Sequence, residues 1–184
     1  MGAGHIRKED FRNAPVSLEV PYRNESLGKC LVVRFLDKYG NETGGIMMAS
    51  REEKEIKEEV KALCEKYKPQ KVLEVGFGMG FTATQFQECG VEKHVIVEAN
   101  AQMARDAQRW KEKYPHKDIE IIEEFLQDYT YDEEDYDLIY DDRYDLMQRN
   151  KHHRAELSAQ GFVRRQHGST FPCWKVIVDR GKKE

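Results

Sequence analysis

Short apolar runs and apolar residues at helical spacing alternate along most of this sequence. Runs typical of buried strands occur at four places: residues 72–75, 94–97, 119–122 and 136–140. Helical spacing predicts one helix that ends at residues 68–69 and two more at 81–89 and 101–114. Strands and helices that alternate in this way predict an α/β fold with a mostly parallel, three-layer, Rossmann-like sheet.

The first of these helices has the clearest amphipathic pattern. Its apolar residues share one face: Ile56, Val60, Leu63, Cys64 and Tyr67. Charged residues occupy the opposite face, as expected for a helix that packs on a sheet and faces water. Ser50 followed by Glu53 matches a capping box, so we expect the helix to begin there.

The residues before this helix predict a different structure. Residues 1–15 are polar and are expected to form a loose arm. Strand character appears in three segments: residues 16–20, 29–36 and 45–48. We therefore divide the chain into an N-terminal arm with a β-hairpin, residues 1–49, and a single α/β domain, residues 50–184. The hairpin covers either the mouth of a site or a subunit interface.

The C-terminal part is short for a sheet of this kind. After the strand predicted at 136–140, strand character remains only at 162–163 and 173–178. The domain is therefore either minimal or completed by a second subunit, and a homodimer is a reasonable expectation. His152 and His153, in a basic segment, are expected to be exposed rather than to bind a ligand.

Length and charge exclude several classes of protein. The 184 residues are enough for one core, and the net charge of −4 argues against nucleic-acid or membrane partners. No apolar run reaches the length of a membrane span, and the N-terminus lacks the apolar segment of a signal peptide. The cysteines lack metal-type spacing, so we expect no metal site but free thiols of a cytoplasmic protein: Cys30, Cys64, Cys89 and Cys173.

The glycines after the strand at 72–75 indicate a ligand site. Gly76, Gly78 and Gly80 form a G-x-G-x-G turn, which lets the backbone approach a ligand. Glu98 follows at the end of the next strand, where an acid can accept hydrogen bonds from ribose hydroxyls. The turn lacks the G-x-x-G arm that binds a pyrophosphate. It favours an adenosine without phosphate, such as that of S-adenosylmethionine (SAM), over the alternative of a plain turn beside a surface acid.

Several of these segments resemble a known family. V-L-E-V-G-F-G-M-G and V-I-V-E-A-N look like the glycine loop and second strand of class I SAM-dependent methyltransferases. Within that superfamily they most resemble guanidinoacetate methyltransferase and related arginine N-methyltransferases, as does Y-D-L-I-Y-D. The resemblance covers residues 45–145. G-I-M-M-A-S-R-E-E lies where the family has a methionine followed by a tryptophan-glutamate pair, and by this placement Glu52 takes the position of the substrate glutamate. The sequence departs from the family at Arg51, which replaces the tryptophan.

The resemblance implies SAM as cofactor and a set of residues around it. The residues implied to bind the cofactor are Glu74, Gly76, Phe77, Gly78, Gly80, Glu98, Ala99, Glu124, Phe125 and Asp141. Among them, Glu98 would hold the ribose, while Glu124 and Phe125 would meet the adenine. Met47 and Met48 resemble a stretch that covers the cofactor, although a methionine pair also suits a core.

The same resemblance implies a guanidino or amine substrate on a small molecule or peptide. Two carboxylates can clamp a planar guanidinium, and one of them must accept the proton that the nitrogen sheds. Asp141, at the end of the strand predicted at 136–140, is the first catalytic candidate, and Glu52 is the second. The next acid, Asp142, is better explained as a loop partner of Arg143. For Glu52 the alternative is a helix-terminal acid favoured by the helix dipole.

Two other functions remain open at this point. Aminopropyltransferases related to spermidine synthase also place an N-terminal β segment before a glycine loop, but D-D-R-Y-D only loosely resembles their acidic motif. The third alternative is a non-catalytic subunit that keeps the SAM-binding fold without a catalytic tail. Methyl transfer from labelled SAM would distinguish a methyltransferase from such a non-catalytic subunit.

Overall fold

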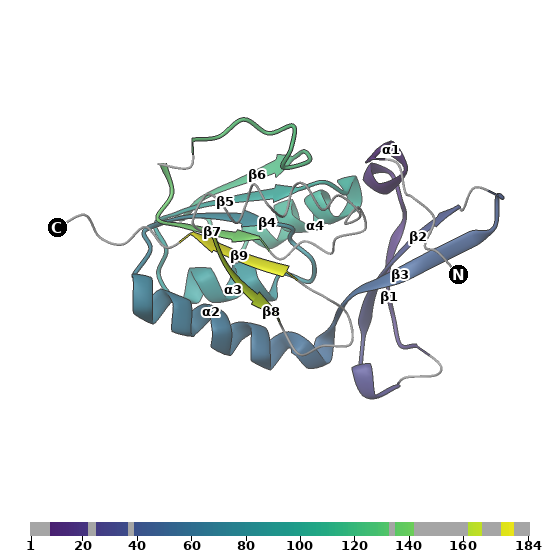
Figure 1. The fold of residues 1–184 in the computed structure, drawn as a ribbon, viewed down its shortest axis with the longest axis horizontal. Helices are drawn as coiled ribbons and strands as arrows, with labels where there is room; N and C mark the ends of the chain where they lie inside the picture. The colour runs from purple at the N-terminus through teal and green to yellow at the C-terminus, as the bar shows by residue number, and fades with distance from the viewer. Residues whose placement is uncertain are drawn as a thin grey trace.

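A computed structural model describes residues 8–21, 25–36, 39–132 and 135–141, together with the backbone of two strands at 162–166 and 174–178. Two sheets form the frame of the protein, one with three strands and one with six. The smaller sheet stands at one end of the larger one, and helices lie against the larger sheet (Figure 1).

The smaller sheet is antiparallel, and its strand order is β1-β2-β3. Its strands are β1 (Val16–Glu19), β2 (Cys30–Leu36) and β3 (Glu42–Ala49), and the short 3-10 helix η1 (Glu25–Leu27) precedes β2. All three segments with strand character are therefore strands, and β3 begins earlier than predicted. The register between β2 and β3 shifts between Leu31 and Val32.

The larger sheet confirms the predicted Rossmann-like α/β fold. Its strand order is β6-β5-β4-β7-β9-β8. The strands are β4 (Lys71–Val75), β5 (Lys93–Glu98), β6 (Asp118–Glu123), β7 (Leu138–Asp141), β8 (Phe162–Gln166) and β9 (Trp174–Val178). The strands β6, β5, β4 and β7 are parallel, whereas β9 runs antiparallel to both of its neighbours. The sheet is therefore mostly parallel, as predicted.

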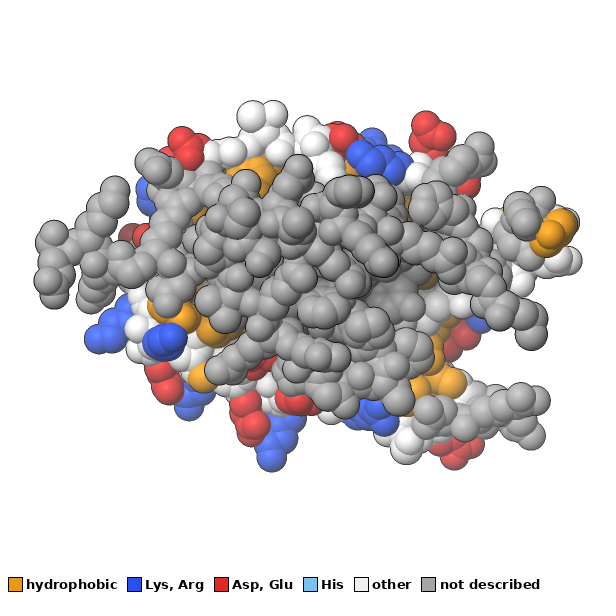
Figure 2. Space-filling view, viewed as in Figure 1, with side chains coloured by type: hydrophobic (Ala, Val, Ile, Leu, Met, Phe, Trp, Pro, Cys, Tyr) orange, Lys and Arg blue, Asp and Glu red, His pale blue; other side chains and the backbone are white. Residues whose placement is uncertain are grey.

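Three helices pack on one face of this sheet: α2 (Glu53–Tyr67), α3 (Phe81–Glu88) and α4 (Ala101–Lys111). The core between α2, α3 and the sheet contains Ile56, Val60, Leu63, Val72, Phe86, Val91, Leu138 and Tyr140. The predicted apolar face of α2 is thus the buried one. Charged side chains line the edge of the molecule where α2 lies (Figure 2), and one of its ion pairs joins Lys57 Nζ to Glu53 Oε1 at 2.9 Å. None of the described helices has the length and apolar composition needed to cross a bilayer.

In the described part of the chain, an aromatic loop covers the opposite face of the sheet. The sheet residues there are Leu73, Val95, Val97 and Ile139. Tyr129, Tyr131 and Tyr136 pack against them, and the rings of Tyr129 and Tyr131 stack with their centroids 5.8 Å apart. Aromatic rings bury a large apolar area per residue, so a short loop can cover this face of the sheet.

Residues 8–15 correct the prediction of a loose arm. They form helix α1 (Lys8–Arg12) and a short turn that leads into β1. Asn100 Nδ2 donates hydrogen bonds to the carbonyl oxygens of Phe11 and Ala14, each at 2.9 Å. The Phe11 ring also packs 6.3 Å from the Phe125 ring. The partners are far away in sequence, and a local polar pattern therefore could not reveal that this segment is fixed.

The predicted capping box at Ser50 and Glu53 is also wrong by one residue. Residues Ser50–Glu52 form a 3-10 turn, η2, before α2. Glu52 Oε2 accepts a hydrogen bond from the Ala49 backbone N–H at 2.8 Å. The acid whose side chain bonds the cap residue is therefore Glu52. The 3-10 turn already begins at Ser50, so the cap is Ala49, one residue earlier than predicted.

Phe86 provides a test of this core. Its side chain is fully buried, with its ring 5.7 Å from the Tyr140 ring. We expect Phe86→Ala to lower the free energy of unfolding by about 3 to 5 kcal/mol, because it leaves a cavity between α3 and the sheet. Leu36→Ala, at a side chain that is 67% exposed, should change it by less than about 0.5 kcal/mol. Urea unfolding measures both, and equal shifts would contradict the assigned core.

Candidate active site at the ends of the parallel strands

The strand order changes direction at β4, the central parallel strand of the larger sheet. The chain passes from β4 to β5 and β6 on one side, and then returns to β7 on the other side of β4. Val75 is level with Val97 on β5 and with Asp141 on β7. The glycine turn, Glu98 and Asp141 therefore lie at the ends of three neighbouring strands. They share the edge of the sheet at which open α/β sheets bind ligands.

The backbone conformation of the glycine turn requires glycine. Gly76, Gly78 and Gly80 have φ angles of 88°, 54° and 75°, which side chains other than glycine rarely adopt. A Cβ on Gly78 would lie 2.9 Å from Met48 Cε, and one on Gly80 would lie 2.8 Å from the Phe77 ring. The turn is thus closely packed from both sides, and α3 begins directly after it.

Glu98 ties this turn to the end of β5. Its Oε2 accepts a hydrogen bond from the Phe77 N–H at 2.8 Å, and its Oε1 accepts one from the Asn100 N–H at 2.8 Å. The side chain is only 3% exposed. Burial raises the pKa of Glu98 to about 7, although the backbone N–H groups, including that of Ala99, act in the opposite direction. Each oxygen can accept a further hydrogen bond, as two neighbouring hydroxyls would require.

Glu74 lies deeper, on the face of β4 that carries α3. Its Oε2 is 2.9 Å from His94 Nε2, and both side chains are buried. Burial raises the pKa of Glu74 well above its ordinary value and lowers that of His94 to about 3. Burial therefore disfavours the charged form of both groups. Gln87 Nε2 lies 3.0 Å from His94 Nδ1 and completes this buried polar group.

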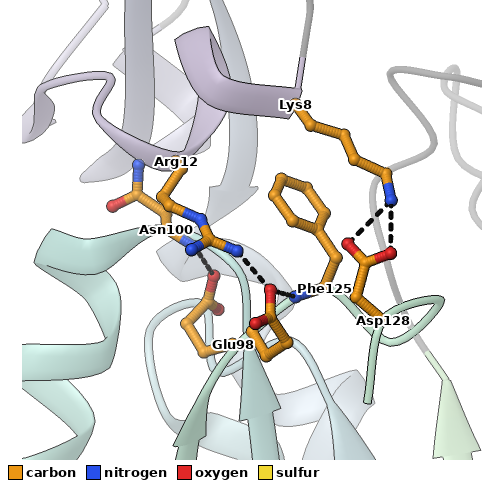
Figure 3. A network of polar contacts seen from close by, with 7 residues as sticks. Lys8, Arg12, Glu98, Asn100, Phe125 and Asp128 are labelled. Carbon is orange, nitrogen blue, oxygen red and sulfur yellow. Dashed lines mark hydrogen bonds and ion pairs between the residues drawn. The ribbon is translucent and has the colours of Figure 1, made fainter.

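The turn after β6 meets the N-terminal helix at the same edge (Figure 3). Phe125 is buried between acidic and basic neighbours, and its N–H donates to Glu124 Oε1 at 3.0 Å. Arg12 pairs with Glu124, and Lys8 Nζ lies 2.8 Å from Asp128 Oδ2. Both cations also lie above the Phe125 ring, with Lys8 Nζ 5.2 Å and Arg12 Cζ 5.4 Å from its centroid.

Sequence analysis missed two residues of this edge. Asn100 caps the start of α4, with its Oδ1 accepting hydrogen bonds from the Gln102 and Met103 N–H groups at 3.0 and 3.1 Å. Asparagine directly before a predicted helix is a capping signal, so Asn100 could have been found. Nothing in the local sequence marks Arg12, whose partner Glu124 is 112 residues away.

The two acids predicted to bind a substrate differ in their surroundings. Asp141 ends β7 and is 6% exposed, at the same edge as Glu98. Glu52 follows β3, and its carboxylate already caps η2. Met48 at the end of β3 does reach the glycine turn, because its Sδ accepts a hydrogen bond from the Met79 N–H at 3.4 Å. Asp142, Arg143, His152 and His153 lie outside the described residues.

Glu98 predicts that stability depends on pH. Its pKa of about 7 exceeds the ordinary value of 4.5, so the folded protein keeps a proton that the unfolded chain releases. The contribution of Glu98 to the free energy of unfolding is fully present below pH 4.5 and is lost as the pH rises through about 7. The loss is on the order of 3 kcal/mol.

Thermal unfolding between pH 5 and 8 measures this effect. Glu98→Gln, which cannot titrate, should lose less stability across this range than the unsubstituted protein. Glu123→Gln, at an exposed acid of the neighbouring strand, should keep the original pH profile. Parallel profiles for Glu98→Gln and the unsubstituted protein would contradict the assignment.

A family comparison agrees with this arrangement. The model of the family described as guanidinoacetate N-methyltransferase matches residues 46–168, which is 123 of the 184 residues (168 − 46 + 1). The match includes the glycine turn, Glu98 and Asp141. It begins within β3, so β1 and β2 precede it. Together with the Rossmann-like sheet, it shows that the chain belongs to the guanidinoacetate N-methyltransferase family and is a methyltransferase of class I fold.

Proposed function

We propose that this protein is a SAM-dependent N-methyltransferase that acts on a guanidino or amine group of a small molecule or peptide. The observation that carries the proposal is the Glu98 carboxyl. It lies at the tip of β5, each of its oxygens accepts one backbone N–H, and the glycine turn lies beside it. Membership of a guanidinoacetate N-methyltransferase family supports the same function.

The residues at this edge fit an adenosine. The two Glu98 oxygens accept hydrogen bonds from the ribose hydroxyls, and Gly76, Gly78 and Gly80 allow the backbone to approach the rest of the molecule. Glu124 offers an acceptor to the adenine amino group, and Phe125 offers an apolar face. When bound, SAM supplies an electrophilic methyl group on a sulfonium sulfur.

Binding at Glu98 requires a side chain to move. Glu98 is 3% exposed, and Arg12 pairs with Glu124 at the same edge of the sheet (Figure 3). Both partners of this ion pair are about one-third exposed, at 36% and 32%, so the pair is partly screened by water and weak. Arg12 therefore leaves Glu124 at little energetic cost when an adenosine enters.

Asp141 is the group that we assign to the substrate. A carboxylate at this position accepts forked hydrogen bonds from a guanidinium and holds one nitrogen in line for transfer. It also accepts the proton that this nitrogen sheds. Glu52 is the second carboxylate of the clamp. It would have to exchange its hydrogen bond from Ala49 for one from the substrate.

Substitutions separate the two roles. Glu98→Ala should abolish binding of S-adenosylhomocysteine, because the ribose loses its acceptor, whereas Asp141→Ala should retain binding and lose turnover. Calorimetry measures binding, and transfer of label from SAM measures turnover. Glu123→Ala, at an exposed acid level with Glu98 on the next strand, is the matched control. Equal loss of binding in the Glu98 and Asp141 variants would overturn this division.

The substrate class is tested with labelled SAM and a panel of guanidines, amines and peptides that includes guanidinoacetate. We expect label to appear on a guanidine or amine nitrogen, because Asp141 can accept hydrogen bonds from such a cation. Label on an oxygen or carbon acceptor alone would refute the assigned acceptor. Tight SAM binding without any transfer would indicate a non-catalytic subunit instead.

A further inference from the structure

Two cysteine side chains lie in contact at the ends of two packed helices. Cys64 is in the last turn of α2, and Cys89 directly follows α3. The Cys64 thiol is within hydrogen-bonding reach of the Cys89 thiol, and both are free and partly exposed. The helices α2 and α3 pack along their length, so the contact is part of the main core packing.

The backbone on both sides of this contact is fixed. The Cys64 carbonyl accepts the Lys68 N–H at 2.8 Å, and the Cys89 N–H donates to the Gln85 carbonyl at 2.9 Å. The Gln85 side-chain amide also lies 3.7 Å from Cys89 Sγ. Cys30 differs because it is fully buried in another cluster, with its Sγ 3.7 Å from the Gly28 carbonyl oxygen.

We propose that Cys64 and Cys89 are a redox modification site, at which an intrachain disulfide joins the ends of α2 and α3. The closed ring would contain β4, the glycine turn and α3. Both helices begin at the candidate active site, α2 after Glu52 and α3 after Gly80, and end at the thiols. The crosslink therefore lies at the opposite ends of these helices from the site.

A disulfide such as oxidised glutathione is a sufficient oxidant. The Cys89 thiolate attacks one glutathione sulfur and expels the first glutathione thiolate. The Cys64 thiol then loses its proton to solvent, attacks Cys89 Sγ and expels the second. Overall, two protein thiols and one glutathione disulfide become one protein disulfide and two glutathione thiols.

The surroundings of Cys64 determine which thiol reacts first and how stable the disulfide is. Burial raises the pKa of the Cys64 thiol, so Cys89 is the first nucleophile and closure accelerates as the pH rises. Because burial disfavours a Cys64 thiolate, the reduced form gains no stability from a charged thiolate there, and the disulfide resists reduction. The crosslink also restricts the unfolded chain, which should raise the melting temperature by roughly 5 to 10 °C.

The full chain, incubated with oxidised glutathione and then digested without reductant, tests this site by mass spectrometry. We expect a peptide that joins Cys64 to Cys89, together with the rise in melting temperature, and dithiothreitol should reverse both. Cys64→Ser should lose both effects, whereas Cys30→Ala should retain them. If Cys64→Ser does not fold, the peptide map of the unsubstituted protein shows by itself whether Cys64 and Cys89 are joined.

Three results would overturn the proposal. Glutathione could remain attached to Cys89 without closure, which would show that the thiols do not approach each other. Either cysteine could pair with Cys173 instead. The crosslink could also form without any rise in melting temperature, which would remove its stabilising role. None of these results depends on whether SAM is the cofactor.

Discussion

The hydrogen bonds of the Glu98 carboxyl hold the candidate site together. One oxygen binds the glycine turn and the other binds the start of α4, so a single side chain fixes two loops at the strand tips. The side chain is buried, and burial raises the pKa of the carboxyl to about 7. Further hydrogen-bond donors, such as ribose hydroxyls, would stabilise its charged form. The same group thus links the stability of the protein to the ligand that we propose.

Asn100 extends this arrangement to the N-terminal sheet. Its backbone binds Glu98, while its side chain caps α4 and binds the carbonyls of Phe11 and Ala14. Gln102 continues the connection, because its side chain exchanges hydrogen bonds with the backbone of Val16 at 2.6 and 3.0 Å. The segment that precedes the family match is therefore attached to residues within it. The smaller sheet is positioned by the same loop that carries the candidate cofactor acid.

The buried polar residues lie in two different places. Glu98 and Asp141 lie at the strand tips, where a ligand can complete their hydrogen bonds. Glu74 and His94 lie in the core, where burial disfavours the charged form of each. The thiols of Cys64 and Cys89 lie at the far ends of α2 and α3. The candidate ligand site and the crosslink that we propose thus lie at opposite ends of the same two helices.

The sequence by itself determined the elements of the sheet, the glycine turn, and the acids that end β5 and β7. These depend on hydrophobic period and on backbone freedom at Gly78 and Gly80, which are local properties. Only the tertiary structure decided that residues 8–15 are fixed, that Glu52 rather than Glu53 caps η2, and that Cys64 meets Cys89. Lys8 and Asp128 are 120 residues apart, and nothing near either one predicts the other. Such contacts form only when the fold brings distant segments together, so a pattern read over a few turns cannot contain them.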